Sequence, residues 1–152
     1  MSQAFLKTIR EAPSATRTII NMTSMAAQGI PPGMSSYSPA KLAVSKFTAY
    51  LAQENPDITA ISLHPGLVPT DMGHSVPYLA PFLHDTAELA GGTAVWLTAG
   101  DKKFLTGRYI TVNWDMEELE SRKDEIKDGD LLTFSVKGKF GIPGVVIEGR
   151  KE

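Results

Sequence analysis

Two side chains in the segment SSYSPAKLAV have the chemistry and the spacing for proton transfer. Tyr37 and Lys41 lie four residues apart, and a helix places residues at this spacing on one face. A lysine ammonium stabilises a phenolate, because opposite charges ~4 Å apart attract by about 4 kcal/mol at an effective dielectric constant of ~20. The pair could therefore act as a general acid and base at a carbonyl or hydroxyl oxygen. Spacing alone nevertheless favours a surface tyrosine beside a solvated lysine, because both residue types are common.

Two further polar side chains stand at the ends of predicted strands. Ser24 precedes Tyr37 by thirteen residues, and its hydroxyl could orient a substrate oxygen or merely satisfy backbone groups of a loop. His64 stands directly before a Pro-Gly pair and is more typical of a packed or hydrogen-bonded histidine than of a base. No group of Asp, Glu and His residues has the spacing of metal ligands, so we expect no metal.

Large apolar side chains near these positions could line a substrate pocket. Each of them, taken alone, is more often part of a hydrophobic core. The set consists of Met25, Met34, Met72, Tyr78, Phe82 and Trp114.

The hydrophobic pattern predicts strands that alternate with helices. Short apolar, β-branched runs indicate buried strands at residues 17–22, 58–64 and 107–114, the last with its core at 109–113. Helical periodicity indicates helices at residues 3–12, 37–53, 85–100 and 115–129. Asp85 is a candidate N-terminal cap, and the segment 73–84 is interpreted as a loop or short lid.

This alternation favours a parallel sheet with helices on both faces, and we expect the strand at 58–64 to be central. In such sheets functional sites lie at the carboxyl ends of the strands. The rule places Ser24, the segment 65–70 and Trp114 along one edge, next to the start of the helix that carries Tyr37.

The composition narrows the possible partners. The chain has 152 residues, no cysteine and a formal net charge of −2, so disulfides and thiolate metal sites are excluded, and charge gives no reason to expect nucleic acid or membrane partners. No apolar run approaches the ~20 residues of a membrane span, and the start lacks the apolar segment of a signal peptide. We expect a cytoplasmic protein with one domain at residues 1–129 and a tail at 130–152 that forms a hairpin or an extension.

These motifs together resemble the carboxyl-terminal half of a short-chain dehydrogenase/reductase, of the kind found in fungi. The family combines a catalytic serine with a Tyr-x-x-x-Lys motif at this separation, and HPGLVPTDM is similar to the segment that lines its nicotinamide site. The resemblance implies that Tyr37 is the general acid and base, that Lys41 stabilises its phenolate, and that Ser24 orients the substrate oxygen. It further implies nicotinamide-end positions at Pro65, Gly66, Val68 and Thr70.

The sequence departs from the family at its amino-terminal end. It contains neither TGxxxGxG nor GxGxxG, the Gly-rich turn that cradles the dinucleotide pyrophosphate. We therefore expect a truncated Rossmann-like α/β fold with about three parallel strands and flanking helices. We expect no cofactor, and the alternative is NADP or NAD.

Three functions stay open at this point. The first is a cofactor-independent enzyme that uses the Ser, Tyr and Lys side chains for isomerisation, dehydration or cyclisation of a small oxygenated metabolite, in fungal specialised metabolism. The second is an NAD(P)H-dependent carbonyl reductase or alcohol dehydrogenase completed by another chain. The third is a non-catalytic remnant that acts by association. Under all three, the exposed edge of the first strand favours a homo-oligomer, most simply a homodimer.

Overall fold

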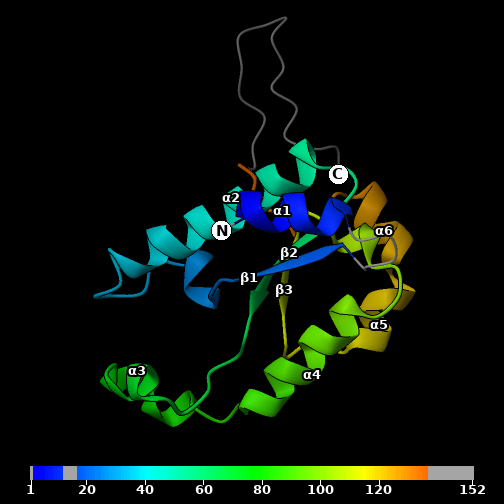
Figure 1. Cartoon of the computed structure of the whole chain (residues 1–152). Helices are drawn as coiled ribbons and strands as arrows, with labels where there is room; N and C mark the ends of the chain where they lie inside the picture. Colours follow the sequence, from blue (N-terminus) through cyan, green and yellow to red (C-terminus); the bar gives the residue numbers. More distant parts are fainter. Residues whose placement is uncertain (1, 12–16, 137–152) are drawn as a thin grey trace, which may run out of the picture.

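The computed structural model describes residues 2–11 and 17–136, which form a three-stranded parallel sheet with helices on both faces (Figure 1). The strands, in spatial order, are β1 (Thr18–Met22), β2 (Thr59–His64) and β3 (Tyr109–Thr111). Both pairings are parallel, with Met22 opposite Leu63 and Leu63 opposite Ile110. This arrangement confirms the predicted α/β fold with its second strand at the centre.

One face of the sheet carries the main apolar core. Ile61, Leu63 and Ile110 are fully buried on this face. They pack with residues from four other elements, namely α4 (Ala87–Thr98), the 3-10 turn η3 (Lys103–Leu105), α5 (Met116–Ser121) and α6 (Lys123–Asp128). Each fully buried side chain of this size stabilises the fold by roughly 1.5–3 kcal/mol.

The opposite face is covered by α1 (Ser2–Glu11) and α2 (Tyr37–Glu54) (Figure 1). A smaller apolar cluster holds α2 there, and its buried members are Leu51, Ile58 and Ala60. Leu6 of α1 packs against the same cluster. The position of α2 matters for function, because this helix begins at the tyrosine of the predicted pair.

The structure corrects the two predictions made for the segments 73–84 and 115–129. The first was expected to be a loop, but it contains part of α3 (Asp71–His74) and the 3-10 helix η2 (Pro77–Phe82). Pro77 fits as the first residue of η2 because the first turn of a helix leaves the proline nitrogen without a required partner, whereas Pro81 lies inside this 3-10 helix. The second was expected to be one helix, but Arg122 divides it into α5 and α6, with φ −96° and ψ 16° outside helical geometry.

The predicted tail lies mostly outside the described residues. Of its members, 130–136 are described, and they form neither helix nor strand. They pack along β3: Tyr109 N donates to Leu132 O at 2.8 Å, and the Phe134 ring meets the Tyr109 ring edge-on at 5.8 Å. In the described part of the chain, no helix combines the length and the hydropathy needed to cross a bilayer.

Candidate functional site

Tyr37 and Lys41 lie together in the first turns of α2. The Lys41 ammonium lies 5.5 Å from the centroid of the Tyr37 ring, a distance at which a cation is attracted to the aromatic face. The same Nζ donates a hydrogen bond to the carbonyl of Met22 at 3.1 Å. Both side chains are half-buried. The predicted pair is therefore brought together, and the last residue of β1 holds it at the carboxyl edge of the sheet.

A row of polar side chains between α2 and β1 fixes the helix in this position. Thr23 Oγ1 donates to the carbonyl of Lys41 at 2.9 Å and lies 2.8 Å from Ser45 Oγ. One helical turn further on, Asn21 Nδ2 donates to Thr48 Oγ1 at 2.9 Å. The sequence prediction missed this row, although Ser45 and Thr48 follow Lys41 at helical spacing.

Ser24 serves as a cap at the end of β1. Its Oγ accepts a hydrogen bond from Ala26 N at 3.2 Å, at the start of the 3-10 turn η1 (Met25–Ala27). A hydroxyl has one donor and two acceptor positions, so this cap leaves the O–H of Ser24 able to donate to another oxygen. The cap is the structural role considered for Ser24, in which its hydroxyl satisfies a backbone group of the loop. The remaining O–H donor leaves room for the catalytic role that the resemblance implies, which is to orient a substrate oxygen.

The loop after β2 contains the four nicotinamide-end positions that the resemblance implies. Gly66 has φ +84°, a conformation that residues with a side chain rarely adopt. Thr70 Oγ1 accepts from Gly73 N at 3.2 Å and caps α3. Pro65 and Val68 belong to the same loop. This loop leaves the carboxyl end of β2, and β2 pairs with β1, whose Met22 carbonyl binds Lys41 Nζ.

Asp85 does not cap α4, as the sequence suggested. That role belongs to Thr86, whose side chain accepts from Leu89 N. The Asp85 carboxylate instead accepts from Leu67 N at 2.6 Å and from Asn113 Nδ2 at 2.7 Å. It therefore joins the loop after β2 to the end of β3, a connection that no local sequence pattern indicates.

His64, the last residue of β2, is buried and faces the α2 side of the sheet. Its Nδ1 has no hydrogen-bond partner among the described residues. Burial lowers the pKa of His64 below its usual value of 6.5, and the negative charge of Asp85 opposes this shift. The structure therefore favours a neutral, packed histidine, in line with the interpretation from the sequence.

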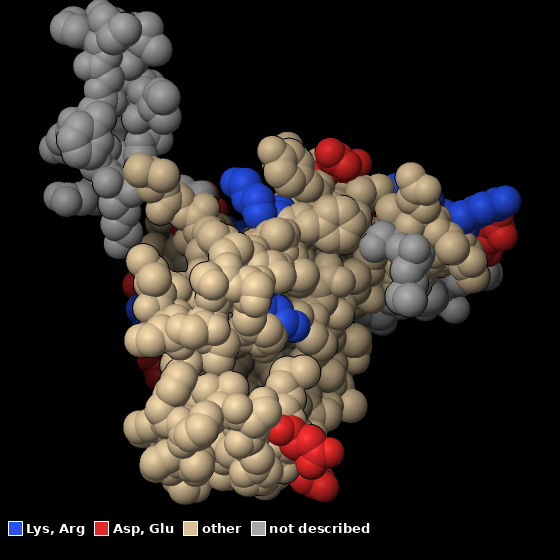
Figure 2. Space-filling view, turned by 90° about the vertical axis from the view of Figure 1, so that its left-hand side faces the viewer, with Lys and Arg blue, Asp and Glu red and all other residues tan. Residues whose placement is uncertain are grey.

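The predicted substrate-lining residues lie mostly on the surface. Met34 is half-buried, whereas the exposed members are Met25, Met72, Tyr78, Phe82 and Trp114. Tyr78 Oη donates to the carbonyl of Pro32 at 3.3 Å and so links η2 to the loop before α2. Figure 2 views the molecule from the side on which α3 and the loop before α2 lie in Figure 1, and shows that uncharged residues cover most of this side.

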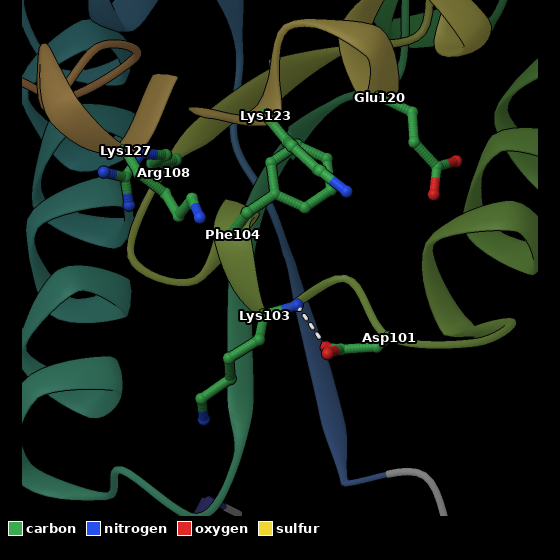
Figure 3. A pocket seen from close by; sticks show the side chains of 7 residues that line it. All are labelled: Asp101, Lys103, Phe104, Arg108, Glu120, Lys123 and Lys127. Atoms are coloured by element: carbon green, nitrogen blue, oxygen red, sulfur yellow. Dashed lines mark hydrogen bonds between the residues drawn. The ribbon is translucent and has the colours of Figure 1, made fainter. Parts of the chain in front are cut away.

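Two hollows elsewhere on the surface are not lined by any predicted site residue. One, of about 450 Å³, lies between η3 and α6 and has a basic lining (Figure 3). Three of the four basic side chains that line it are engaged: Lys103 donates to two backbone carbonyls, Arg108 pairs with Asp130 at 3.1 Å, and Lys127 pairs with Asp124 at 2.9 Å. The other, of about 640 Å³, lies beside the middle of α2. Among the described residues, His, Asp and Glu side chains form no group of three that could hold a metal ion.

The described residues show no site for the pyrophosphate of a dinucleotide. In this part of the chain, β1 is followed by a long helix, α2, but the connection runs through the 3-10 turn η1 and the segment 28–36, and not through a tight Gly-rich turn. β2 leads through the segment 65–70 into the four-residue helix α3, and β3 leads into the six-residue helix α5. The turn that binds a pyrophosphate needs several free amides at a helix start, so these residues alone do not fit a whole dinucleotide.

Comparison with known proteins places these residues in a family context. The sequence pattern of the family described as short chain dehydrogenase matches residues 1–78, the stretch that contains Ser24, Tyr37 and Lys41. The chain is 40% identical over 119 residues to the short chain dehydrogenase mpl6 of Monascus purpureus, and 39% identical over 129 residues to the short chain dehydrogenase pgmD of Aspergillus terreus. These alignments cover 76% and 80% of this chain but 41% of each relative. The chain therefore spans less than half the length of the curated relatives it matches.

Solved structures share the fold. The KRED1-Pglu enzyme is similar with a TM-score of 0.60 and 27% identity, over 71% of this chain and 51% of that enzyme. A putative oxidoreductase from Escherichia coli is similar with a TM-score of 0.58 and 26% identity, over 72% of this chain and 46% of that protein. The family pattern over half the chain, the fungal relatives and the matching parallel sheet together show that the chain belongs to the short-chain dehydrogenase/reductase family.

Proposed function

We propose that this chain catalyses proton transfer at a carbonyl or hydroxyl group of a small oxygenated metabolite, without oxidation or reduction, in an isomerisation, dehydration or cyclisation. The observation that carries the proposal is the placement of one cation. Lys41 Nζ lies 5.5 Å from the Tyr37 ring centroid and is fixed by its hydrogen bond to Met22. A phenol that can give or take a proton and a cation that can attract a developing oxyanion are thus held in one arrangement.

The chemistry balances within the substrate and the protein. The Tyr37 phenolate removes a proton from the carbon next to a carbonyl group, and the O–H of Ser24 donates a hydrogen bond to the oxygen on which negative charge develops. In an isomerisation of an α-hydroxy ketone, the Tyr37 phenol then returns the proton to the former carbonyl carbon, while the hydroxyl proton passes to the former carbonyl oxygen. In a dehydration, the phenol instead protonates a departing β-hydroxide, and in a cyclisation it protonates the oxygen of a second carbonyl group that the carbanion attacks. No electron leaves or enters the substrate, so the reaction requires no oxidant or reductant.

The surroundings of the pair support an uncharged substrate. Met25, Met72, Tyr78 and Phe82 are exposed apolar or aromatic side chains on the elements around the carboxyl edge. Figure 2 shows that this side of the molecule carries few charged side chains. A neutral molecule with apolar and carbonyl groups matches such a surface better than a phosphorylated one. We place it in fungal specialised metabolism, because the curated relatives are fungal.

Two observations favour a second function. The chain spans 41% of the length of the curated relatives, and β1 pairs with β2 alone among the described strands. A second polypeptide that supplied further strands and a dinucleotide-binding turn could pair with the free edge of β1. The complex would then be an NAD(P)H-dependent carbonyl reductase or alcohol dehydrogenase, in which Tyr37, Lys41 and Ser24 keep their roles.

Association of identical chains is compatible with both functions. The outer side of α2 exposes three large apolar or aromatic side chains, Leu42, Phe47 and Tyr50, here called the strip, and Lys46 lies among them with its Nζ 5.9 Å from the Tyr50 ring centroid. We propose that two copies bury this strip in a homodimer located in the cytoplasm. If Tyr37 proves dispensable, such association would be the function of a non-catalytic remnant.

Deuterium incorporation tests the proposed acid–base activity without knowledge of the natural substrate. The purified chain is incubated with hydroxyacetone in D2O, and loss of the C–H signals is followed by proton NMR. We expect the exchange to be faster than in buffer or with heat-denatured chain. Exchange at the rate of buffer alone would contradict the proposal.

Calorimetry with NADPH separates the two functions. The loss of several hydrogen bonds to phosphate, each worth ~1.5–3 kcal/mol, moves a micromolar binder into the millimolar range. We therefore expect no saturable binding of NADPH by this chain at micromolar concentration. Saturable micromolar binding would restore the reductase and overturn the cofactor-free proposal.

A further inference from the structure

Asp85 connects two segments that are far apart in the sequence. Its Oδ2 accepts a hydrogen bond from Leu67 N at 2.6 Å, and its Oδ1 accepts one from Asn113 Nδ2 at 2.7 Å. Asp85 also donates its own N–H to the carbonyl of Leu67 at 3.2 Å. Asp85 therefore binds both the N–H and the carbonyl of Leu67, and also the side chain of Asn113, which follows β3.

The side chain of Asn113 is oriented for this contact. Thr111 Oγ1 donates to Asn113 Oδ1 at 3.0 Å, which leaves the amide nitrogen to face the carboxylate of Asp85. Both carboxylate oxygens thus meet an N–H donor. Hydrogen bonds with a charged acceptor are roughly twice as strong as neutral ones, and the part-buried bond to Leu67 contributes more to holding the loop than the exposed bond to Asn113.

Gly66 leaves the space that the carboxylate occupies. A Cβ at this position would lie 2.5 Å from Asp85 Oδ2, far inside van der Waals contact. The absence of a side chain at Gly66 therefore makes room for the Asp85 carboxylate that binds Leu67. A side chain at Gly66 would displace the carboxylate from its partners.

The loop that Asp85 holds begins beside the acid–base pair. Lys41 Nζ binds the carbonyl of Met22, and Met22 is paired with Leu63 on the neighbouring strand. Paired strands lie about 4.8 Å apart, so the chain that leaves β2 runs along the same edge as the Lys41 ammonium. The loop therefore starts at the edge of the sheet to which Lys41 is bound.

We propose that Asp85 is a positioning residue for the site at Tyr37: it holds the segment 65–70 in one conformation, so that the backbone of this segment forms a fixed boundary for the substrate. The inference rests on the proposed acid–base function of Tyr37. Asp85 itself takes no proton from the substrate. It acts through the Leu67 backbone.

An exchange of the two side chains tests this role. The variants are Asp85→Asn, Asn113→Asp and the double variant that carries both changes. In Asp85→Asn, one amide oxygen replaces two acceptors, and the new NH2 group faces the NH2 group of Asn113. In Asn113→Asp, two carboxylates face each other. In the double variant, the amide at position 85 can accept from Leu67 and donate to the carboxylate at position 113, so the hydrogen-bond pattern is restored with the charge moved.

Hydrogen exchange of the Leu67 amide, measured by NMR, is the readout that does not depend on activity. We expect both single variants to exchange this amide about tenfold faster or more, and the double variant to return to within about threefold of the original chain. The amide of Leu63 in the centre of the sheet is the internal control for global unfolding. Unchanged Leu67 exchange in both single variants, or a double variant no better than the singles, would overturn the proposal.

The hydroxyacetone exchange assay supplies the second readout. A positioning role predicts that the single variants raise KM about tenfold with a smaller change in kcat, and that the double variant recovers KM. Faster Leu67 exchange with unchanged KM would show that Asp85 only stabilises the loop, and would overturn the positioning role. No activity in the original chain would contradict the function proposed for Tyr37, whereas the Leu67 data would still show whether Asp85 holds the loop.

Discussion

Lys41 binds the carbonyl of Met22, the last residue of β1, at 3.1 Å. This bond connects the Lys41 side chain, on α2, to the carboxyl edge of the sheet. The loops after all three strands begin at this edge. Thr23, the next residue along the chain, binds the backbone carbonyl of Lys41 at 2.9 Å. Side chain and backbone of Lys41 are therefore both fixed by the end of β1, and Tyr37, one turn earlier, is placed with them.

The polar layer under α2 predicts the effect of Thr48→Val. Thr48 is fully buried and accepts from Nδ2 of the half-buried Asn21 at 2.9 Å, so the isosteric valine removes the acceptor of this amide N–H. We expect a loss of about 1–3 kcal/mol in the free energy of unfolding, measured by urea denaturation. Thr98→Val is the matched control, because exposed Thr98 bonds only to carbonyls of its own helix. Equal effects of the two substitutions would contradict this account.

Strand order and the approach of Tyr37 to Lys41 could be predicted, because both depend on short-range pattern. Alternating apolar runs and helices determine a right-handed parallel sheet, and a spacing of four residues determines one helix face. The partners of Asp85 could not be predicted. An acidic residue before a helix has the pattern of a cap, whereas its partners, Leu67 and Asn113, lie 18 and 28 residues away.

The division of the segment 115–129 into two helices at Arg122 could not be predicted from the sequence either. The charge pattern of residues 115–129 is that of one continuous helix, and Arg122 binds Glu118 on one side of the break and Glu125 on the other. Such pairs form across a change of helix axis as well as within a helix. Leu119 of α5 and Ile126 of α6 both pack in the main core. These contacts, which the sequence pattern does not specify, set the directions of the two helix axes.

His64 predicts how stability depends on pH. Burial lowers its folded-state pKa below 6.5, with Asp85 opposing the shift, so below pH ~6.5 the unfolded chain binds a proton that the folded chain resists. We expect stability to fall as pH decreases from about 7.5 to about 5.5, and His64→Gln to reduce this slope. The control is His74→Gln, because His74 is exposed. An unchanged slope in His64→Gln, measured by urea denaturation at each pH, would contradict the assignment.

Gly66 predicts a difference between two glycine substitutions. Gly66 and Gly33 both have positive φ, at +84° and +76°, so alanine at either position costs roughly 1–2 kcal/mol of backbone strain. Only at Gly66 does the new Cβ also meet Asp85, whereas at Gly33 nothing lies within 4 Å. We expect Gly66→Ala to lower the melting temperature clearly more than Gly33→Ala. Equal melting temperatures would show that the loop moves away from Asp85 without cost.

The strip on the outer side of α2 predicts self-association. Phe47 is 49% exposed and Leu42 is 40% exposed, so a monomer leaves these apolar surfaces in contact with water. We expect light scattering to give a dimeric mass at micromolar concentration and above, and Phe47→Lys to shift it towards the monomer. Ile30→Lys is the control, because Ile30 is fully exposed in the loop before α2. A monomeric mass for the original chain would exclude this interface.

The central claim is that Tyr37 and Lys41 work as an acid–base pair, and α2 itself provides the control. Lys46 and Tyr50 form a second pair on this helix, with Lys46 Nζ 5.9 Å from the Tyr50 ring centroid. The two pairs are similar in type and spacing, but Lys41 alone of the two lysines is tied to the end of β1.

The measurement is the rate of deuterium incorporation into hydroxyacetone by four single variants, namely Tyr37→Phe, Lys41→Met, Tyr50→Phe and Lys46→Met. We predict that Tyr37→Phe lowers the rate by about 10²–10⁴-fold and that Lys41→Met lowers it by about tenfold or more, with both variants folded by circular dichroism. The two control variants keep the rate of the original chain. A Tyr37→Phe variant that exchanges as fast as Tyr50→Phe would contradict the account.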